Sequence, residues 1–458
     1  MIKITKILRI DLETKNIDYE DYTDEDEVNL IGGMGLATAI FTREVDPEID
    51  PFDGNNLMIF SVGPFCGTAI PFCGRYFITA KSPLTKILGE ASSGGFFGKE
   101  LKSAGYDLLI IKGKSQSPVY LWINDGQVEI KDASELWGKA KEEGLKVPPF
   151  LILSITKQCN LHCAGCYAAA AGTLSIKSEK QLNIDAWRKI IKEGNDLGVF
   201  CYVIAGGEPF MFPNLLDLCS EFKDRGFLIF TNGTALKETD YEKLKKLKNV
   251  AIIVSIEGDK EDTDSRRGVG VYEKVLKTIN RLNKIGTING ISVTINGINY
   301  KKWMNPSMID FLIKKGVRIG FFLEYIPTKH DITESLMLTE EERTAFRKQI
   351  LNYRANKKIY LIHSPGDEEY MGGCVSAGRG FAHVTPSGAL TPCPVSSITT
   401  HNLTKSSLRE GLASDFFKYI RENEHLLKTE GSPCALFSHQ EELALIASKF
   451  KASKVGTL

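Results

Sequence analysis

The stretch FLILSITKQCNLHCAGC, residues 150–166, decides how the middle of this chain folds and what it can bind. An apolar run of strand length leads into a loop in which Cys159, Cys163 and Cys166 are spaced Cys-x3-Cys-x2-Cys. Three thiolates on such a loop can hold three irons of a four-iron, four-sulfur (4Fe-4S) cluster and leave the fourth iron without a protein ligand. A structural zinc site is the alternative, but such sites are closed by a fourth Cys or His nearby. The spacing therefore predicts a 4Fe-4S cluster with one iron open to a substrate.

Polar residues follow three further apolar runs. The run 199–205 ends in Gly206-Gly207-Glu208-Pro209, where two glycines allow close approach of the backbone to a ligand and Glu208 offers a carboxylate to a cationic amine. Two more apolar runs, 227–230 and 250–254, are also followed by polar residues. These are candidate ligand-binding residues at strand ends: Thr231, Asn232, Ser255 and Glu257. Arg266 is a candidate partner for a ligand carboxylate, although a solvated pair with Arg267 is an equally good reading.

The cysteine loop and the Gly206–Pro209 run together resemble the radical S-adenosylmethionine (radical SAM) enzymes. In that family the open iron is chelated by the amino and carboxylate groups of S-adenosylmethionine (SAM), and the Gly-Gly-Glu-Pro run holds the amino group. The resemblance implies that Cys159, Cys163 and Cys166 are the catalytic cluster ligands. It also implies that a low-potential, ferredoxin-like donor supplies the electron that cleaves SAM to methionine and a 5′-deoxyadenosyl radical. The family more usually has Asp where Glu257 stands, so this residue is expected to contact the ribose or to cap a turn.

Periodicity in the same region predicts an α/β fold. Six β-branched runs of strand length alternate with amphipathic stretches of helix length, which indicates a βα repeat and a parallel sheet. The expected strands are 150–156, 199–205, 227–231, 250–256, 291–296 and 317–325, and the expected helices are 184–197, 214–225, 239–248, 271–285 and 307–315. Because six strands are too few for a closed barrel of eight, we expect a partly open (βα)6 barrel over 150–330, with the cluster at the carboxyl ends of the strands.

The first 145 residues have a different texture, with short strands, many turns and a hairpin signal over 120–130. Their glycine-rich segments are IGGMGLA (31–37), TAKSPLT (79–85), SSGGFFG (92–98) and LKSAGYD (101–107). These segments resemble the N-terminal domain of the tungsten-containing aldehyde ferredoxin oxidoreductases, a β-rich saddle for a tungsten or molybdenum pterin. The resemblance makes Arg75, Ser93, Gly94 and Gly95 candidate pterin contacts, and the alternative is that the glycines only form turns. Met34 stands where the family commonly has Arg, and the helical domains of that family are missing, so the chain is not expected to be an aldehyde oxidoreductase by itself.

The C-terminal third carries a second cysteine set. After an expected helical connector at 331–372, residues 373–458 contain Cys374, Cys393 and Cys434, with a hairpin expected between Phe381 and Leu390. This pattern resembles the shortened auxiliary-cluster extensions called SPASM or twitch domains, which implies an auxiliary 4Fe-4S cluster. The fourth ligand is then the substrate, His439 or His401, and the alternative is three ordinary thiols.

Composition excludes several classes of function. The 57 basic and 57 acidic residues balance, so no bulk charge attracts nucleic acid or a membrane surface. The start of the chain is not typical of a signal peptide, and no apolar run approaches the length of a membrane span. We therefore expect a cytoplasmic protein whose ten cysteines are reduced.

Three functions fit these features. The first is modification or assembly of a tungsten or molybdenum pterin, or of the aldehyde ferredoxin oxidoreductase-like protein that carries it. The second is modification of a ribosomal peptide, with the N-terminal domain as a docking surface. The third is a non-catalytic assembly factor for an aldehyde oxidoreductase-like partner.

Overall fold

A computed structural model describes residues 7–21, 29–68, 74–94, 97–124, 126–134, 144–166, 168, 180–327, 336–429 and 433–455. The chain divides into two compact units, Met1–Glu142 and Glu143–Leu458. Gly95 lies outside the described residues, so its predicted role is not tested. Among the described helices, none is long and apolar enough to cross a membrane.

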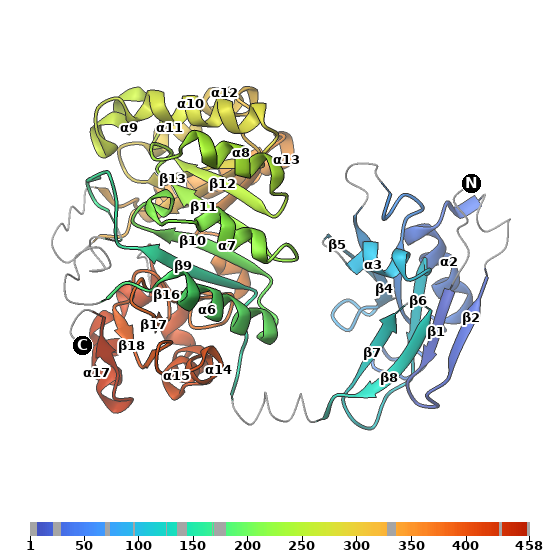
Figure 1. The fold of residues 1–458 in the computed structure, drawn as a ribbon. Helices are drawn as coiled ribbons and strands as arrows, with labels where there is room; N and C mark the ends of the chain where they lie inside the picture. The colour runs from blue at the N-terminus through green and yellow to red at the C-terminus, as the bar shows by residue number, and fades with distance from the viewer. Residues whose placement is uncertain are drawn as a thin grey trace. The chain divides into compact units, whose positions relative to one another are not determined.

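The N-terminal unit is built on a six-stranded sheet in the order β2-β1-β6-β3-β4-β5 (Figure 1). Side chains alternate between its two faces: Ile7 and Ile110 pack on helix α2, whereas Leu8 and Leu109 belong to a second core with helix α3. The predicted hairpin is confirmed as β7–β8. The elements are β1 (Ile7–Asp11), β2 (Ile17–Glu20), α2 (Gly33–Glu44), β3 (Met58–Val62), β4 (Tyr76–Lys81), β5 (Leu88–Ser93), α3 (Phe97–Ser103), β6 (Leu108–Lys112), β7 (Val119–Asn124) and β8 (Gln127–Asp132).

The second unit contains a ten-stranded sheet in the order β15-β14-β13-β12-β11-β10-β9-β16-β17-β19. Strands β9 to β15 pair in parallel, and the sheet does not close on itself, so the predicted partial barrel is confirmed. The six predicted strands appear as β9 (Phe150–Thr156), β10 (Cys201–Gly206), β11 (Gly226–Thr231), β12 (Val250–Ser255), β13 (Asn289–Ile295) and β14 (Ile319–Glu324).

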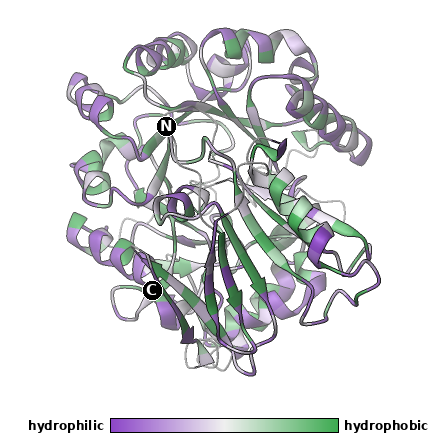
Figure 2. Ribbon diagram, turned by 90° about the vertical axis from the view of Figure 1, so that its right-hand side faces the viewer, coloured by the Kyte–Doolittle hydropathy of each residue, from purple (hydrophilic) through white to green (hydrophobic). Residues whose placement is uncertain are grey.

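The helices between the strands are mostly mixtures of apolar and polar residues (Figure 2), and their apolar residues belong to the core that covers the sheet. Helix α6 begins where the Asn183 side chain accepts a hydrogen bond from the Ala186 N–H, and it buries Trp187 completely. The helical elements are α6 (Ile184–Leu197), η1 (Pro209–Met211), α7 (Leu215–Glu221), α8 (Glu238–Lys246), α9 (Lys260–Arg267), α10 (Val271–Lys284), α11 (Tyr300–Met304), α12 (Pro306–Lys314) and α13 (Glu340–Asn356).

The predicted helical connector at 331–372 is wrong in part. It contains α13, but it also contains β15 (Tyr360–Ser364), which adds a seventh parallel strand beside β14. This strand is short and includes a buried histidine, so its sequence lacks the continuous apolar run that marks the other strands.

The C-terminal hairpin, predicted between Phe381 and Leu390, is confirmed as β16 (Phe381–Val384) and β17 (Ala389–Thr391). Strand β16 pairs in parallel with β9, so the hairpin extends the barrel sheet on the side opposite β10. The remaining elements are η3 (Glu368–Met371), β18 (Ile398–Thr399), β19 (His401–Asn402), α14 (Leu408–Leu412), α15 (Asp415–Glu422), η4 (Glu424–Leu427), α16 (Ala435–Ser438), α17 (Gln440–Lys449) and β20 (Ser453–Lys454).

A buried histidine joins the hairpin to the strand that leads into the cysteine loop. His383 Nε2 lies 2.8 Å from Ser154 Oγ on β9, and Nδ1 lies 2.7 Å from Thr391 Oγ1 on β17. The Thr391 hydroxyl in turn donates to the carbonyl of Cys393. Because burial disfavours the charged ring, the pKa of His383 is lowered to about 3.

We predict that His383 makes the stability of the protein depend on pH. The unfolded chain binds a proton on this ring near pH 6.5, whereas the folded chain does not do so until about pH 3, so stability is complete above pH 6.5 and falls as the pH drops. Between pH 7.5 and 5.5 the wild type should lose about 1 kcal/mol more of its free energy of unfolding than His383→Gln. Urea titrations measure this difference. The exposed His425→Gln variant is the control and should follow the wild type.

Candidate active site at the ends of the barrel strands

The carboxylate of Glu208 lies at the centre of the site and is almost completely buried, with a relative exposure of 1%. Its Oε1 accepts hydrogen bonds from Thr231 Oγ1 at 2.6 Å and from the Phe210 N–H at 3.1 Å, and its Oε2 accepts one from the Asn232 N–H at 2.7 Å. Burial raises the pKa of Glu208, and these donors oppose the shift. The structure thus brings together Glu208, Thr231 and Asn232, three residues that the sequence predicts for one site.

The two glycines before Glu208 pack against the start of the cysteine loop. A side chain at Gly207 would place its Cβ 2.1 Å from the Gln158 carbonyl oxygen, and one at Gly206, where φ is +123°, would lie 2.6 Å from the Thr156 carbonyl oxygen. The Gly207 N–H donates to the Thr156 carbonyl, and the Glu208 N–H donates to the Gln158 carbonyl. Close packing of backbone on backbone therefore requires both glycines.

Asn160, inside the cysteine loop, joins that loop to the turn after β11. Its Oδ1 accepts from Asn232 Nδ2, and its Nδ2 donates to Thr234 Oγ1, both at 2.8 Å. Asn160 is missing from the predicted site, although an amide between two cluster-type cysteines is a usable signal. Gln181, which accepts from Thr156 Oγ1 and from the Lys157 N–H, is also missing, and no local pattern marks it.

Glu257, Arg266 and Arg267 form a buried charge group beside the same loop. Both guanidinium groups contact Glu257 Oε1, and Oε2 accepts from the Thr294 N–H. The Glu257 backbone carbonyl is held by Asn299 and Trp303. Ser255 ends β12 nearby and is half-buried, and within the described part of the chain no hydrogen bond ties its side chain to the charge group.

The three thiols of the loop are not in disulfides and are half-buried. Burial raises the pKa of Cys159, and the neighbouring Glu208 carboxylate and the other two thiols raise it further. Burial also raises the pKa of Cys163, whereas the charges of Arg267 and Arg266 oppose that rise. Among the residues that the structure describes, no three Cys, His, Asp or Glu side chains gather tightly enough for a single metal ion.

The second cysteine set also gathers in the fold. Burial raises the pKa of Cys393, and the negative charges of the Cys374 and Cys434 thiolates raise it further. The carboxylate of Glu368 raises the pKa of Cys374 and that of Cys434. Burial raises the pKa of Cys374 to about 12 and that of Cys434 to about 11. Glu368 is held at this place because Ser364 Oγ donates to it at 2.8 Å and the Val375 N–H at 3.2 Å.

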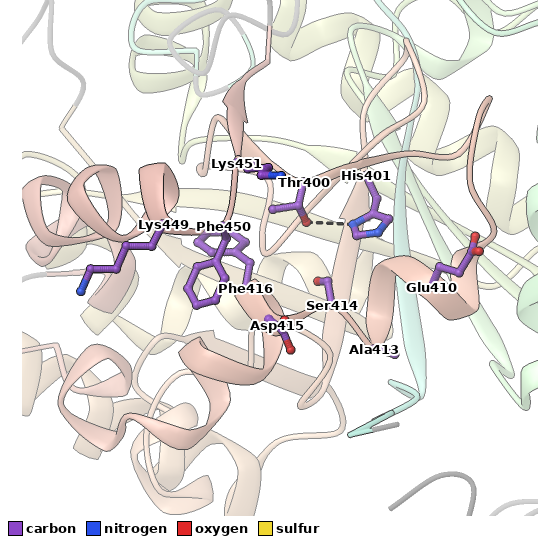
Figure 3. A pocket seen from close by; sticks show the side chains of 10 residues that line it. All are labelled: Thr400, His401, Glu410, Ala413, Ser414, Asp415, Phe416, Lys449, Phe450 and Lys451. Atoms are coloured by element: carbon purple, nitrogen blue, oxygen red, sulfur yellow. Dashed lines mark hydrogen bonds between the residues drawn. The ribbon is translucent and has the colours of Figure 1, made fainter. Parts of the chain in front are cut away.

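The two histidines proposed to complete this second set lie in different surroundings. His401 bonds to Thr400 Oγ1 and faces a hollow of about 420 Å³ between β19, α15 and the end of α17, and no cysteine lines that hollow (Figure 3). His439 precedes α17, and its buried Nε2 has no hydrogen-bond partner among the described residues. Of the two, only His439 has a buried ring nitrogen without a hydrogen-bond partner among the described residues, and its ligand role stays a prediction.

The N-terminal candidates lie at the end of the β4–β5 ladder, where Tyr76 pairs with Ser93. Arg75 Nη1 donates to Ser92 Oγ at 2.9 Å, Ser93 ends β5, and Gly94 follows in open space, where a Cβ would meet no described atom within 4 Å. In contrast, Gly33 has φ +57°, and a Cβ on it would lie 3.5 Å from the Gly63 Cα. The positive φ of Gly33 therefore favours glycine at the start of α2, whereas Gly94 is not required by packing against described residues.

Two family models match this chain. Residues 7–146 match the model for the aldehyde ferredoxin oxidoreductase N-terminal domain, and residues 153–312 match the model for the radical SAM superfamily. The tungsten-containing aldehyde ferredoxin oxidoreductase of Pyrococcus horikoshii is 46% identical over 138 residues, which are 30% of this chain and 23% of that protein. This chain thus spans less than a quarter of the length of that relative.

The barrel has relatives of its own. The AdoMet-dependent heme synthase of Methanosarcina barkeri is 24% identical over 307 residues, covering 61% of this chain and 86% of that protein. A crystal structure of Streptococcus suis SuiB bound to S-adenosylmethionine shares the fold with a TM-score of 0.53 at 20% identity, covering 62% of this chain and 70% of that one. The resemblance of residues 373–458 to the SPASM or twitch extensions stays a prediction. The predicted resemblances of the other two regions are confirmed, and the chain combines an aldehyde ferredoxin oxidoreductase N-terminal domain with a domain of the radical SAM superfamily.

Proposed function

We propose that this chain is a radical SAM enzyme that cleaves S-adenosylmethionine by reduction. The observation that carries the proposal is the hydrogen-bonded junction of the cysteine loop with Glu208 and the 231–234 turn at three adjacent strand ends. This junction sets a carboxylate beside Cys159, so a cationic amine bound at the open iron would meet a negative charge.

The residues of the chain have separate tasks in this proposal. Cys159, Cys163 and Cys166 would hold the cluster, and Glu208 would bind the amino group of SAM. When bound, the cluster supplies one electron, which breaks the bond between the SAM sulfur and the 5′ carbon and yields methionine and a 5′-deoxyadenosyl radical that takes a hydrogen atom from the substrate. A ferredoxin-like protein is the proposed source of the electron. The strand-end residues exclude water and orient SAM, and no general base is needed.

The set Cys374, Cys393 and Cys434 supports an auxiliary 4Fe-4S cluster of the twitch kind. Burial and the neighbouring groups raise the pKa of Cys374 and of Cys393, so these thiols can ionise to become ligands only if a positive group compensates the charge. Cluster irons would supply that compensation.

The substrate that the domain combination supports best is a tungsten or molybdenum pterin, free or bound to an aldehyde ferredoxin oxidoreductase-like partner. The support is the 46% identity to a tungsten enzyme in a domain that places Arg75 and an unhindered Gly94 at one strand end. A tetrapyrrole is the second candidate, because 86% of an AdoMet-dependent heme synthase aligns with this chain.

Iron counting after anaerobic reconstitution tests the two cysteine sets. We expect about eight irons per wild-type chain and about four for Cys163→Ala and for Cys374→Ala. SAM cleavage, followed as 5′-deoxyadenosine, should disappear only in Cys163→Ala. A count of only about four irons in the wild type would contradict the proposed auxiliary cluster. If no 5′-deoxyadenosine forms in the presence of dithionite, the proposed activity is wrong and the non-catalytic assembly factor is favoured.

Glu208→Gln tests the amine contact. The amide keeps the size of the side chain but loses its charge, so we expect SAM to bind about tenfold more weakly with the iron content unchanged. Equilibrium binding of SAM to the reconstituted protein measures this. If SAM affinity stays at the wild-type value while the melting temperature falls, Glu208 only supports the turn after β11.

Purification of the full chain from cells grown with tungstate tests the substrate. We expect bound tungsten and pterin in the wild type, detected by mass spectrometry and by fluorescence after oxidation, and their loss in Arg75→Ala. The matched control, exposed Lys114→Ala, should keep both. If none of these proteins carries tungsten or pterin, and the wild type converts iron porphyrin precursors, then the substrate is a tetrapyrrole and not a pterin.

A further inference from the structure

Arg266 contacts the two residues that separate Cys163 from Cys166. Its Nε donates to the Ala164 carbonyl at 3.1 Å, and its Nη2 donates to the Gly165 carbonyl at 3.3 Å. The Ala164 N–H returns a hydrogen bond to the Arg266 carbonyl at 2.9 Å. Three hydrogen bonds thus fasten the end of α9 to the second half of the cysteine loop.

The third guanidinium nitrogen of Arg266, Nη1, binds Glu257 Oε1 at 2.5 Å. Glu257 cannot move with it, because the Thr294 N–H from β13 holds the other carboxylate oxygen, and Asn299 and Trp303 hold the Glu257 carbonyl. The side chain of Glu257 is only 2% exposed. Arg266 is therefore anchored to the barrel at one end of its guanidinium and to the loop at the other.

A second contact limits the same loop segment. Gly165 has φ +62°, and a Cβ on it would lie 3.2 Å from the ring of Tyr325, which is buried after β14. The two residues between Cys163 and Cys166 thus have Arg266 on their carbonyl groups and Tyr325 against Gly165. A loop held in this way has its thiols placed before any iron arrives.

We propose that Arg266, anchored by Glu257, is a positioning residue that holds Cys163 and Cys166 in the geometry that binds the cluster, rather than a contact for the carboxylate of SAM. Each of its three guanidinium nitrogens already has an acceptor within the protein. The inference deepens the proposed function and rests on it for the identity of the cluster, but the fastening of the loop is a property of the chain alone.

The length of the Glu257 side chain also contributes to the anchoring of Arg266. An aspartate at this position would draw the carboxylate back by one methylene, away from Arg266, while its charge stayed the same. Glu257→Asp should therefore loosen the loop, although it keeps the charge balance of the group.

Cysteine alkylation in the full-length, iron-free protein tests the fastening without any cluster. Peptide mass spectrometry would give the rates at which iodoacetamide modifies Cys163 and Cys166, with the buried Cys219 as internal reference. We expect Arg266→Gln and Glu257→Asp to raise both rates about tenfold, because the first loses the hydrogen bonds to the loop and the second loses the anchor that holds Arg266 in place. Arg266→Lys keeps the charge but cannot reach both carbonyl groups and the carboxylate, so it should behave like Arg266→Gln.

Arg267→Gln is the matched control. Arg267 binds the same Glu257 oxygen and is similarly buried, yet in the described structure no hydrogen bond joins it to the loop. Loss of either arginine removes a charge that favours the Cys163 thiolate, so that effect is common to the two variants. Equal rates in Arg267→Gln and Arg266→Gln, or wild-type rates in Arg266→Lys, would overturn the proposal.

The reconstituted protein provides a second readout. Under a chelator, the electron paramagnetic resonance signal that responds to added SAM should decay about tenfold faster in Arg266→Gln than in Arg267→Gln. If the wild type has no such signal, the proposed function fails, whereas the alkylation rates still decide the role of Arg266. If the signal is present and decays equally in both variants, only the role of Arg266 is wrong.

Discussion

The buried carboxylate of Glu208 is the constraint on which the strand-end site depends. A carboxylate that loses its water needs hydrogen-bond donors in return, and here they come from Thr231, Asn232 and Phe210. Thr231 ends β11 and Asn232 follows it, whereas Glu208 follows β10, so the requirement is met only when the two strands pair in the observed register. Through Asn232 and Asn160, the same hydrogen bonds extend to the loop after β9. One buried charge thus ties three neighbouring strand ends together.

The predictable part of this site is the part that chain order and strand geometry dictate. Parallel strands place their carboxyl ends at one edge, so polar residues that follow successive apolar runs must meet there. This reasoning locates Cys159, Glu208, Thr231 and Asn232 correctly. It also gives the partial barrel, because six of its strands are continuous apolar runs with β-branched residues.

The parts that the sequence does not reveal depend on contacts between distant segments. Nothing near residue 383 indicates that its ring will bond to Ser154, 229 residues earlier, or that β16 will pair with β9. The connector hides β15 because a short strand with a buried histidine has no distinctive period. Arg266 illustrates a different limit: its charge suggests a ligand carboxylate, but the fold directs it to Glu257 and to backbone carbonyls. The residue type shows which groups a side chain can bind, but only the folded structure shows which groups it does bind.

The two cysteine sets differ in their electrostatic surroundings rather than in the number of thiols. Cys163 lies near two arginines that share the Glu257 carboxylate, which leaves a net positive charge beside this thiol, whereas the Glu208 carboxylate acts on Cys159. Cys374 and Cys434 instead face the carboxylate of Glu368. A positive neighbour favours the thiolate and any added electron, whereas a carboxylate opposes both. Because each set offers three thiols, it is these neighbours that distinguish the electrostatic surroundings of the two sites.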